Sequence, residues 1–253
     1  AALVHRSVRA LAAGPLAGQG VNQNARHGNS DSFMTRQDNE VGATRGLSTS
    51  LPGFRHVAGY LDREAQIVLL TAVREVIRQA PLYTPTMPRS GKALSVRMTN
   101  AGPLGWVSDK DGGYRYQVTH PVTGTKWPAL PPLLLQIWDE LSGYSEPPEA
   151  CLINYYTGEA RLGSHIDADE QNTMAPVLSV SLGDTAIFHI GGLKRSDPKT
   201  RITLTSGDVI VLGGAARFAY HGIDRVLAGT SDLLPERGRI NLTLRRVTLP
   251  AEP

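Results

Sequence analysis

A histidine and an aspartate one residue apart form the first candidate site for chemistry, in His165-Ile166-Asp167. The segment before them has the character of a strand, and side chains alternate along an extended chain, so His165 and Asp167 point to the same side. His221 is the candidate third ligand, 54 residues beyond Asp167 (221 − 167), and we place it near the end of the strand-like run after Gly207. Two histidines and one carboxylate on one face of an ion leave coordination positions open. This arrangement suits a non-haem Fe(II) centre that takes a chelating co-substrate and dioxygen.

Each part of this motif also has a plainer interpretation. A His-x-Asp triplet is short enough to occur by chance, and a lone histidine such as His221 is more often a hydrogen-bonded structural residue than a ligand. We assign His120 and His189 to that structural class. The metal interpretation therefore needs support from a second cluster.

The second cluster is a run of strict alternation over 239–245, with the sequence Arg-Ile-Asn-Leu-Thr-Leu-Arg. In a strand, Arg239, Asn241, Thr243 and Arg245 share one face and the apolar residues share the other. If the apolar face packs into a wall, both guanidinium groups enter one cavity, where a buried arginine needs an anionic partner. Two such groups at one end of a pocket suit a small dicarboxylate. The alternative is an edge strand with a solvated basic face. Together with the metal triad, the cluster predicts an oxygenase that depends on 2-oxoglutarate.

Helices are expected before strands along the chain. Apolar residues recur at three- and four-residue steps over 62–79 and 132–142, which predicts two helices. From residue 150 onward, glycine-containing turns separate short apolar runs. We predict strands at 151–156, 177–182, 186–190, 201–205, 208–213 and 239–247, and a loop at 228–238. This order predicts an α+β fold that begins with helices and ends in a β-sandwich or jelly roll.

Composition narrows the class of protein. The sequence contains no apolar run of about 18 residues, so we expect no membrane span. The single cysteine, Cys151, excludes a disulfide scaffold and a cysteine-based zinc finger, and it fits a reducing compartment. A net charge of +3 permits a nucleic-acid partner without requiring one. Residues 1–50 are rich in small and polar residues, with no acidic residue before Asp31, and we expect a disordered or weakly ordered extension before a single domain at 51–253. We expect a cytoplasmic protein; the alternative is that residues 1–50 hold a mitochondrial transit peptide.

A series of short motifs runs through residues 80–247 in a fixed order. They are Met98-Thr99-Asn100, Leu104-Gly105-Trp106, Trp127-Pro128-Ala129, Cys151 to Tyr156, His165 to Glu170, Ser179 to Gly183, Gly191 to Arg195, Tyr220-His221-Gly222 and Arg239-x-Asn241-x-Thr243-x-Arg245. In this order they resemble the AlkB family of Fe(II)/2-oxoglutarate-dependent dioxygenases, which dealkylate nucleic acids. Residues 1–50 fall outside the resemblance.

The resemblance implies an α+β fold with a double-stranded β-helix (jelly-roll) core, flanked by N-terminal helices and a nucleotide-recognition lid. It also implies a set of roles for residues of this chain. It implies Fe(II), 2-oxoglutarate and O2 as cofactor and co-substrates, with His165, Asp167 and His221 as the iron ligands. The residues implied to line the 2-oxoglutarate site are Asn154, Tyr156, Leu162, Ser179, Arg239, Asn241 and Arg245. The residues implied to contact the substrate are Met98, Thr99, Trp106, Tyr114, Asp169 and Arg195, of which Met98, Thr99 and Tyr114 belong to a nucleotide-recognition lid at about 88–116. Glu170, in contrast, we interpret as a solvated loop acid.

The implied activity is oxidative demethylation of bases such as 1-methyladenine and 3-methylcytosine, in DNA or also in RNA. Formaldehyde and succinate are released, which amounts to DNA repair by direct reversal. The expected partner is an alkylated single-stranded or flipped-out nucleic acid, and the expected state is a monomer away from membranes. Two alternatives are a Fe(II)/2-oxoglutarate hydroxylase acting on a protein, lipid or small molecule, and a jelly-roll binding module without iron.

Three positions depart from the family pattern. Lys92 stands near the place where a lid tyrosine is expected, and Leu212 stands where a close relative has tryptophan. One residue is inserted before Tyr114, at Gly112-Gly113. These departures concern the shape of the lid and the range of substrates, and they leave the iron chemistry unchanged.

Overall fold

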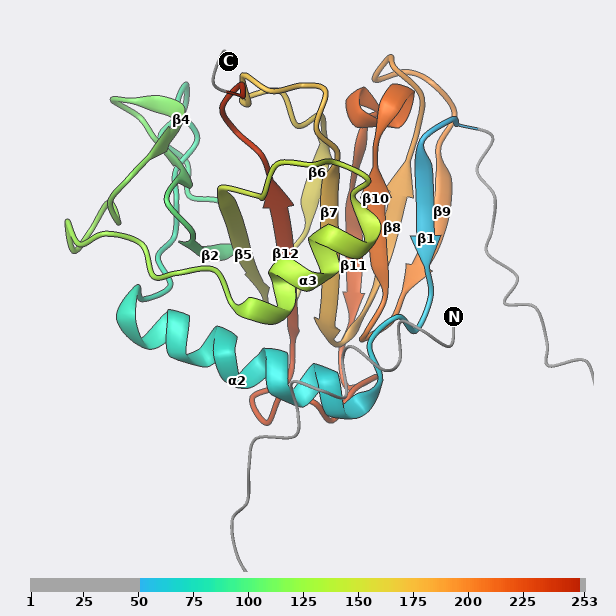
Figure 1. The fold of residues 1–253 in the computed structure, drawn as a ribbon, viewed down its shortest axis with the longest axis horizontal. Helices are drawn as coiled ribbons and strands as arrows, with labels where there is room; N and C mark the ends of the chain where they lie inside the picture. Colours follow the sequence, from blue (N-terminus) through green and yellow to red (C-terminus); the bar gives the residue numbers. More distant parts are fainter. Residues whose placement is uncertain (1–50, 251–253) are drawn as a thin grey trace, which may run out of the picture. The chain divides into compact units, whose positions relative to one another are not determined.

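Two antiparallel sheets face each other in the computed structural model, which describes residues 51–250 (Figure 1). The expected extension at 1–50 lies outside the described residues. The larger sheet has the order β1-β10-β7-β12-β5-β2 and the smaller sheet the order β6-β11-β8-β9. The strands of the larger sheet are β1 (Phe54–Val57), β2 (Arg97–Ala101), β5 (Ala150–Tyr156), β7 (Val177–Gly183), β10 (Val209–Leu212) and β12 (Arg239–Arg245). Those of the smaller sheet are β6 (Leu162–His165), β8 (Thr185–Ile190), β9 (Thr200–Leu204) and β11 (His221–Leu227). The predicted jelly-roll core is confirmed.

Two helices flank the larger sheet. The first, α2 (Arg63–Gln79), begins where the Asp62 side chain accepts a hydrogen bond from the Ala65 amide at 2.9 Å, as expected for an N-cap. The second, α3 (Pro132–Leu141), starts at a proline, and Trp138 is fully buried. Figure 1 shows α3 in front of the larger sheet and α2 along its lower end. Neither helix in the described range has the length and apolar character needed to cross a membrane.

The six strands expected from the sequence are present, with small shifts at their ends, and four more complete the two sheets. In β2, residues 98–101 are buried although Thr99 and Asn100 are polar. The strand therefore lacks the alternation of apolar and polar residues that predicts a strand from sequence. The position expected for His221 is wrong. The strand after Gly207 ends at Leu212, a 3-10 helix over Gly214–Phe218 follows, and His221 begins β11. The break comes at Gly213-Gly214, where Gly214 has a positive φ of 50°.

Strand β12 lies in the middle of the larger sheet, between β5 and β7. All seven of its residues are buried, which excludes the edge strand with a solvated basic face. Because its side chains alternate, the polar set faces the space between the sheets and the apolar set faces the opposite side. The space between the sheets is closed by an apolar cluster to which both contribute, including Tyr156, Val177, Ile210 and Leu212 from the larger sheet and Phe188, Ile202, Leu204 and Ile223 from the smaller.

A separate hairpin forms the second part of the predicted lid. Its strands are β3 (Gly105–Asp109) and β4 (Gly113–Gln117), and Trp106 pairs with Tyr116 across it. A side chain at Gly105 would collide with the ring of Trp127 and with Asn100, so glycine lets the base of the hairpin pack closely. At the tip, Asp109 forms an ion pair of 2.7 Å with Arg115, which closes the turn containing the inserted residue.

Candidate metal and co-substrate site

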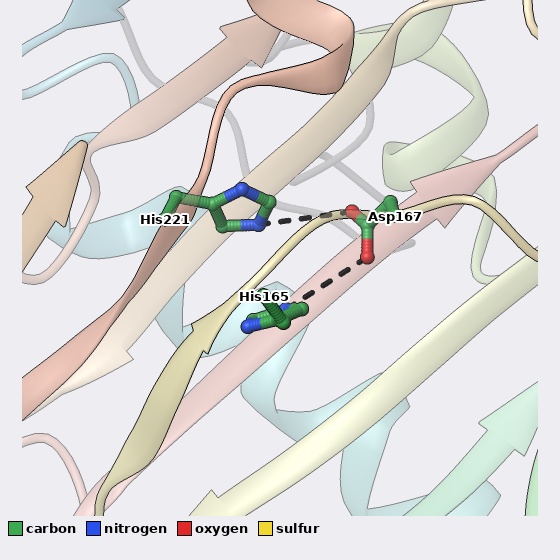
Figure 2. Close-up of side chains that lie close together, drawn as sticks. All are labelled: His165, Asp167 and His221. Atoms are coloured by element: carbon green, nitrogen blue, oxygen red, sulfur yellow. Dashed lines mark ion pairs between the residues drawn. The ribbon is translucent and has the colours of Figure 1, made fainter. Parts of the chain in front are cut away.

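Two adjacent strands bring the three predicted metal ligands together. His165 is the last residue of β6 and His221 the first of β11, and the two are register partners. Asp167 follows two residues after β6. His165 Nε2 lies 3.9 Å from Asp167 Oδ1, and His221 Nε2 lies 3.8 Å from Asp167 Oδ2 (Figure 2). One ligand atom from each residue lies within 4.8 Å of the others, so the predicted triad converges on one point.

Hydrogen bonds on the far side of each imidazole fix which nitrogen faces that point. The Nδ1 atoms of His165 and His221 lie 2.9 Å from the carbonyl oxygens of Gly163 and Ala219. A carbonyl only accepts, so Nδ1 carries the proton and the Nε2 lone pair is directed inward, as in metal-binding histidines generally. Burial lowers the pKa of His221 to about 4, although Asp167 opposes the shift, so this ring is neutral at pH 7 and able to bind a cation.

The carboxylate of Asp167 is also prepared for a cation. Burial alone would raise its pKa, but Arg245 and the two imidazoles outweigh burial and hold the pKa well below its ordinary range. One of its oxygens, Oδ2, is buried and has no hydrogen-bond partner among residues 51–250. A buried anionic acceptor without a partner is costly unless a cation completes it. The donor set of two nitrogens and one carboxylate therefore fits Fe(II).

Beside the triad lies a cavity of about 470 Å³ with Arg239 in its wall. The Arg239 side chain is fully buried, and Nη2 donates to Ser181 Oγ at 2.9 Å, whereas Nε and Nη1 have no hydrogen-bond partner in the part of the chain that the structure describes. Burial lowers the pKa of Arg239 to about 10, so the group stays charged at neutral pH. A buried guanidinium with two unpaired donor atoms fits a carboxylate ligand, which can accept both.

Arg245 takes a different place from the one expected. It is six residues from Arg239 on the same strand (245 − 239), so their Cα atoms are about 20 Å apart at the usual rise of a strand. Arg245 Nη2 donates to Asp167 Oδ1 at 2.8 Å, and Nε lies 3.2 Å from Glu170 Oε1. The structure therefore separates the two arginines along the wall of one cavity, and the role of Arg245 in binding 2-oxoglutarate stays a prediction. Alternation put them on one face, but the length of the strand separates them, and Arg245 belongs to the metal end.

The other residues expected around the co-substrate all line the cavity. Asn241 Nδ2 donates to Ser179 Oγ at 2.6 Å, which fixes two of them against each other across β12 and β7. The full set at the cavity wall is Asn154, Tyr156, Leu162, Ser179, Arg239, Asn241 and Arg245. Leu212 also lines this cavity and is almost fully buried.

Five of the six expected substrate residues also border the cavity: Met98, Trp106, Tyr114, Asp169 and Arg195. The rings of Trp106 and Tyr114 are stacked, with centroids 5.5 Å apart, and Trp106 Nε1 donates to Asp169 Oδ2 at 2.7 Å. Thr99 is the exception. Its neighbour Met98 faces the cavity, so Thr99 faces the opposite side of β2 and donates to the Ala80 carbonyl at 2.8 Å.

Sequence reasoning missed a buried charge cluster behind Asp167. Glu170 was expected to be solvated, but its side chain is 2% exposed and forms an ion pair of 2.7 Å with Arg217, which is equally buried. The Tyr116 hydroxyl donates to the other oxygen of Glu170. No spacing signal identifies Arg217, because it lies in a short 3-10 helix among alanines. The strongest indication of this cluster in the sequence is Glu170 itself, an acidic residue three positions after the metal ligand Asp167.

The two histidines assigned structural roles have them. His120 Nε2 lies 2.8 Å from the Pro81 carbonyl, and His189 Nδ1 lies 2.6 Å from Asp224. Neither contributes to the metal site, which supports separating them from His165 and His221.

The fold and the site together define a class, the jelly-roll oxygenases that hold Fe(II) with two histidines and a carboxylate. The sequence signature of the 2OG-Fe(II) oxygenase superfamily matches residues 53–245. An alpha-ketoglutarate-dependent dioxygenase AlkB homolog from Caulobacter vibrioides is 50% identical over 210 residues, which cover 81% of this chain and 94% of that protein. AlkB from Escherichia coli K12 is 43% identical over 182 residues, covering 70% and 83% of the two chains. The solved structure of OsALKBH1 superposes with a TM-score of 0.64 at 30% identity, covering 79% of this chain and all of that one.

The chain therefore belongs to the AlkB family of 2OG-Fe(II) oxygenases. It is a dioxygenase that depends on Fe(II), 2-oxoglutarate and O2.

Proposed function

We propose that this enzyme removes N-linked methyl groups from nucleobases of the 1-methyladenine and 3-methylcytosine type, in DNA and also in RNA, and so repairs them by direct reversal. The observation that carries the proposal is the pairing of an aromatic ring with a carboxylate at the border of the metal cavity. Trp106 and Asp169 both line that cavity and are joined by a hydrogen bond of 2.7 Å. A flat cationic base needs a ring to stack on and an anion to attract it.

The residues of the site divide the work of the reaction. His165, Asp167 and His221 would hold the iron, and Arg239 would bind a carboxylate of 2-oxoglutarate. Bound Fe(II), 2-oxoglutarate and O2 together supply the oxidation that turns an N-methyl group into N-hydroxymethyl, with succinate and CO2 as co-products. The N-hydroxymethyl group then loses formaldehyde: the C–N bond breaks, its electron pair returns to the ring nitrogen, the hydroxyl proton is released to water, and the neutral base remains. The protein positions the methyl group and limits the access of water.

Recognition of the base rests on the free oxygen of Asp169. Its Oδ2 accepts the hydrogen bond from Trp106, which leaves Oδ1 to accept from the exocyclic amino group of adenine or cytosine. The same carboxylate attracts the positive charge of the methylated ring. A base inside a duplex cannot reach a buried metal, so the substrate must be single-stranded or flipped out.

The test is release of formaldehyde and succinate from a trinucleotide carrying 1-methyladenine, with the unmethylated trinucleotide as the control. We expect equal amounts of both products from the methylated substrate. Asp169→Asn keeps the shape of the side chain and removes its charge, and we expect kcat/KM to fall by about tenfold or more, equivalent to about 1.4 kcal/mol. Succinate formation without formaldehyde from any alkylated oligonucleotide would instead favour the hydroxylase of a protein, lipid or small molecule.

The proposal includes a monomeric enzyme in the cytoplasm. All three metal ligands and the three arginines of the cavity come from one chain, so a second copy is not needed to complete the site. Cys151 is free and buried, which suits a reducing compartment. Light scattering and cell fractionation test these two points.

A further inference from the structure

Two side chains of the hairpin donate hydrogen bonds to consecutive carboxylates just behind the metal ligand Asp167. Trp106 Nε1 donates to Asp169 at 2.7 Å, and the Tyr116 hydroxyl donates to Glu170. Trp106 and Tyr116 are register partners on β3 and β4. Directly opposite residues of an antiparallel pair project to the same face. These two hydrogen bonds therefore attach the hairpin to adjacent residues of the segment after Asp167.

Glu170 connects these hydrogen bonds to the metal ligand Asp167 through two buried arginines. One of its oxygens accepts from Arg217 Nη2 at 2.7 Å, and the other lies 3.2 Å from Arg245 Nε. Arg245 donates to the side chain of Asp167, and Arg217 donates to its backbone carbonyl. Two positive and two negative groups thus balance in a buried cluster. Burial raises the pKa of Tyr116 well above its ordinary value, so the hydroxyl keeps its proton and donates to the cluster at neutral pH.

The base of the hairpin is anchored by contacts that do not involve the metal ligands. The Asn100 side chain exchanges two hydrogen bonds of 3.0 Å with the backbone of Trp106. The Ser108 hydroxyl donates to the Thr86 carbonyl at 2.6 Å. The hairpin therefore has one attachment independent of the metal site and one attachment that depends on the order of the segment behind Asp167.

We infer that Tyr116 and Trp106 are positioning residues that couple metal binding to the placement of the hairpin at the cavity. A divalent cation held by Asp167 restricts that carboxylate and, through Arg245 and Arg217, restricts Glu170. A segment that is already restricted loses less conformational entropy when the hairpin forms its two hydrogen bonds to it. The metal therefore favours the state in which these hydrogen bonds are formed. By linkage, formation of these two hydrogen bonds raises the affinity for the metal by the same factor. The substrate-facing hairpin is thus set in place preferentially over a loaded metal site. The inference rests on the metal site and is independent of the substrate.

Hydrogen exchange of the full chain, followed by mass spectrometry, tests the coupling with Mn(II) alone as the probe. In the wild-type protein we expect Mn(II) to slow exchange in peptides within 105–117 by about fivefold or more, the lower end of couplings between sites. Tyr116→Phe removes one hydroxyl and keeps the ring. In this variant we expect the slowing to fall below about twofold and the Mn(II) dissociation constant to rise by the matching factor.

Tyr155→Phe is the matched control. It removes a tyrosine hydroxyl that donates to the Arg237 carbonyl at 3.1 Å, away from the hairpin, and the wild-type slowing is expected to persist. Thermal melting confirms that each variant is folded. Trp106→Phe is the second variant, because it removes the hydrogen bond to Asp169. It is also expected to reduce the effect of Mn(II) on hydrogen exchange within 105–117.

The inference is overturned if Tyr116→Phe keeps the full response to Mn(II), or if the wild-type hairpin does not respond at all. The experiment contains no nucleic acid, so its failure leaves the demethylase proposal standing. Conversely, a failure to release formaldehyde from methylated trinucleotides does not bear on the coupling.

Discussion

Replacing Arg239 with methionine should make the ligand-free protein more stable and at the same time abolish its response to 2-oxoglutarate. The guanidinium is fully buried, and two of its three nitrogens lack hydrogen-bond partners within the described range 51–250. Burial moves its pKa from the ordinary range above 12 to about 10, which corresponds to about 3 kcal/mol at 1.36 kcal/mol per pKa unit. A pKa lowered in the folded state means that folding disfavours the charged form. Because pH 7 lies below the folded pKa, the cost is present in full there, and it fades only as the pH rises through about 10.

Methionine removes this charge and fills much of the same volume. The variant also loses the hydrogen bond to Ser181, worth about 1 kcal/mol. The net gain is therefore about 2 kcal/mol, which corresponds to a rise in Tm of about 4–8 °C for a domain of this size. In the wild-type protein with Mn(II), 2-oxoglutarate at about 100 times its Kd should add about 2.7 kcal/mol by mass action. The Arg239→Met variant should show no stabilisation when 2-oxoglutarate is added.

Differential scanning calorimetry with Mn(II), with and without 2-oxoglutarate, measures both effects. Arg217→Met is the matched control, because Arg217 is equally buried but is paired with Glu170. That variant leaves a buried carboxylate with one partner fewer and should lose stability. The reasoning is refuted if Arg239→Met melts below the wild-type protein, or if 2-oxoglutarate still raises its Tm.

Three further predictions concern the metal end of the site. Glu170→Ala should lower the free energy of unfolding in urea by about 3–5 kcal/mol, because Arg217 and Arg245 lose a buried counter-charge; a loss below about 1 kcal/mol would contradict the cluster. Arg245→Leu should weaken Mn(II) binding, measured by calorimetric titration, by about 2–5 kcal/mol because it frees the Asp167 side chain; an effect confined to 2-oxoglutarate would return Arg245 to the co-substrate. The metal-free protein should lose up to about 3 kcal/mol as the pH falls from about 6.5 to 4, because burial lowers the pKa of His221 to about 4 and the unfolded chain takes up the proton first. Urea unfolding across this range measures the slope, and His221→Asn should flatten it.

The sequence predicted the parts of the site that depend on local alternation. His165 and Asp167 are two residues apart at the end of a strand, and the polar set of β12 shares one face, so both groups follow from the period of a strand. It did not predict how far apart along β12 the two arginines act. Alternation determines the face of a strand, whereas the position along a pocket depends on the length of the strand and on what packs at each end.

The remaining differences have a similar origin. No local pattern indicates that Glu170 is buried, because its partners Arg217 and Tyr116 come from segments 47 and 54 residues away. Strand β2 was missed because its buried residues Thr99 and Asn100 use polar side chains to bond neighbouring backbone. Tertiary contacts satisfy these polar groups, and no local periodicity reports them.

The place of β12 has a consequence for how this protein is made. It is the last strand of the described chain, yet it fills the gap between β5 and β7. Until the ribosome has added Arg245, both neighbours have an open edge of unpaired backbone groups, where strands of other chains can pair. A nascent chain that stops before Arg239 already carries every metal ligand but lacks the strand that joins the halves of the larger sheet. An intermediate in which this strand is unpaired therefore exposes two strand edges at which chains can aggregate.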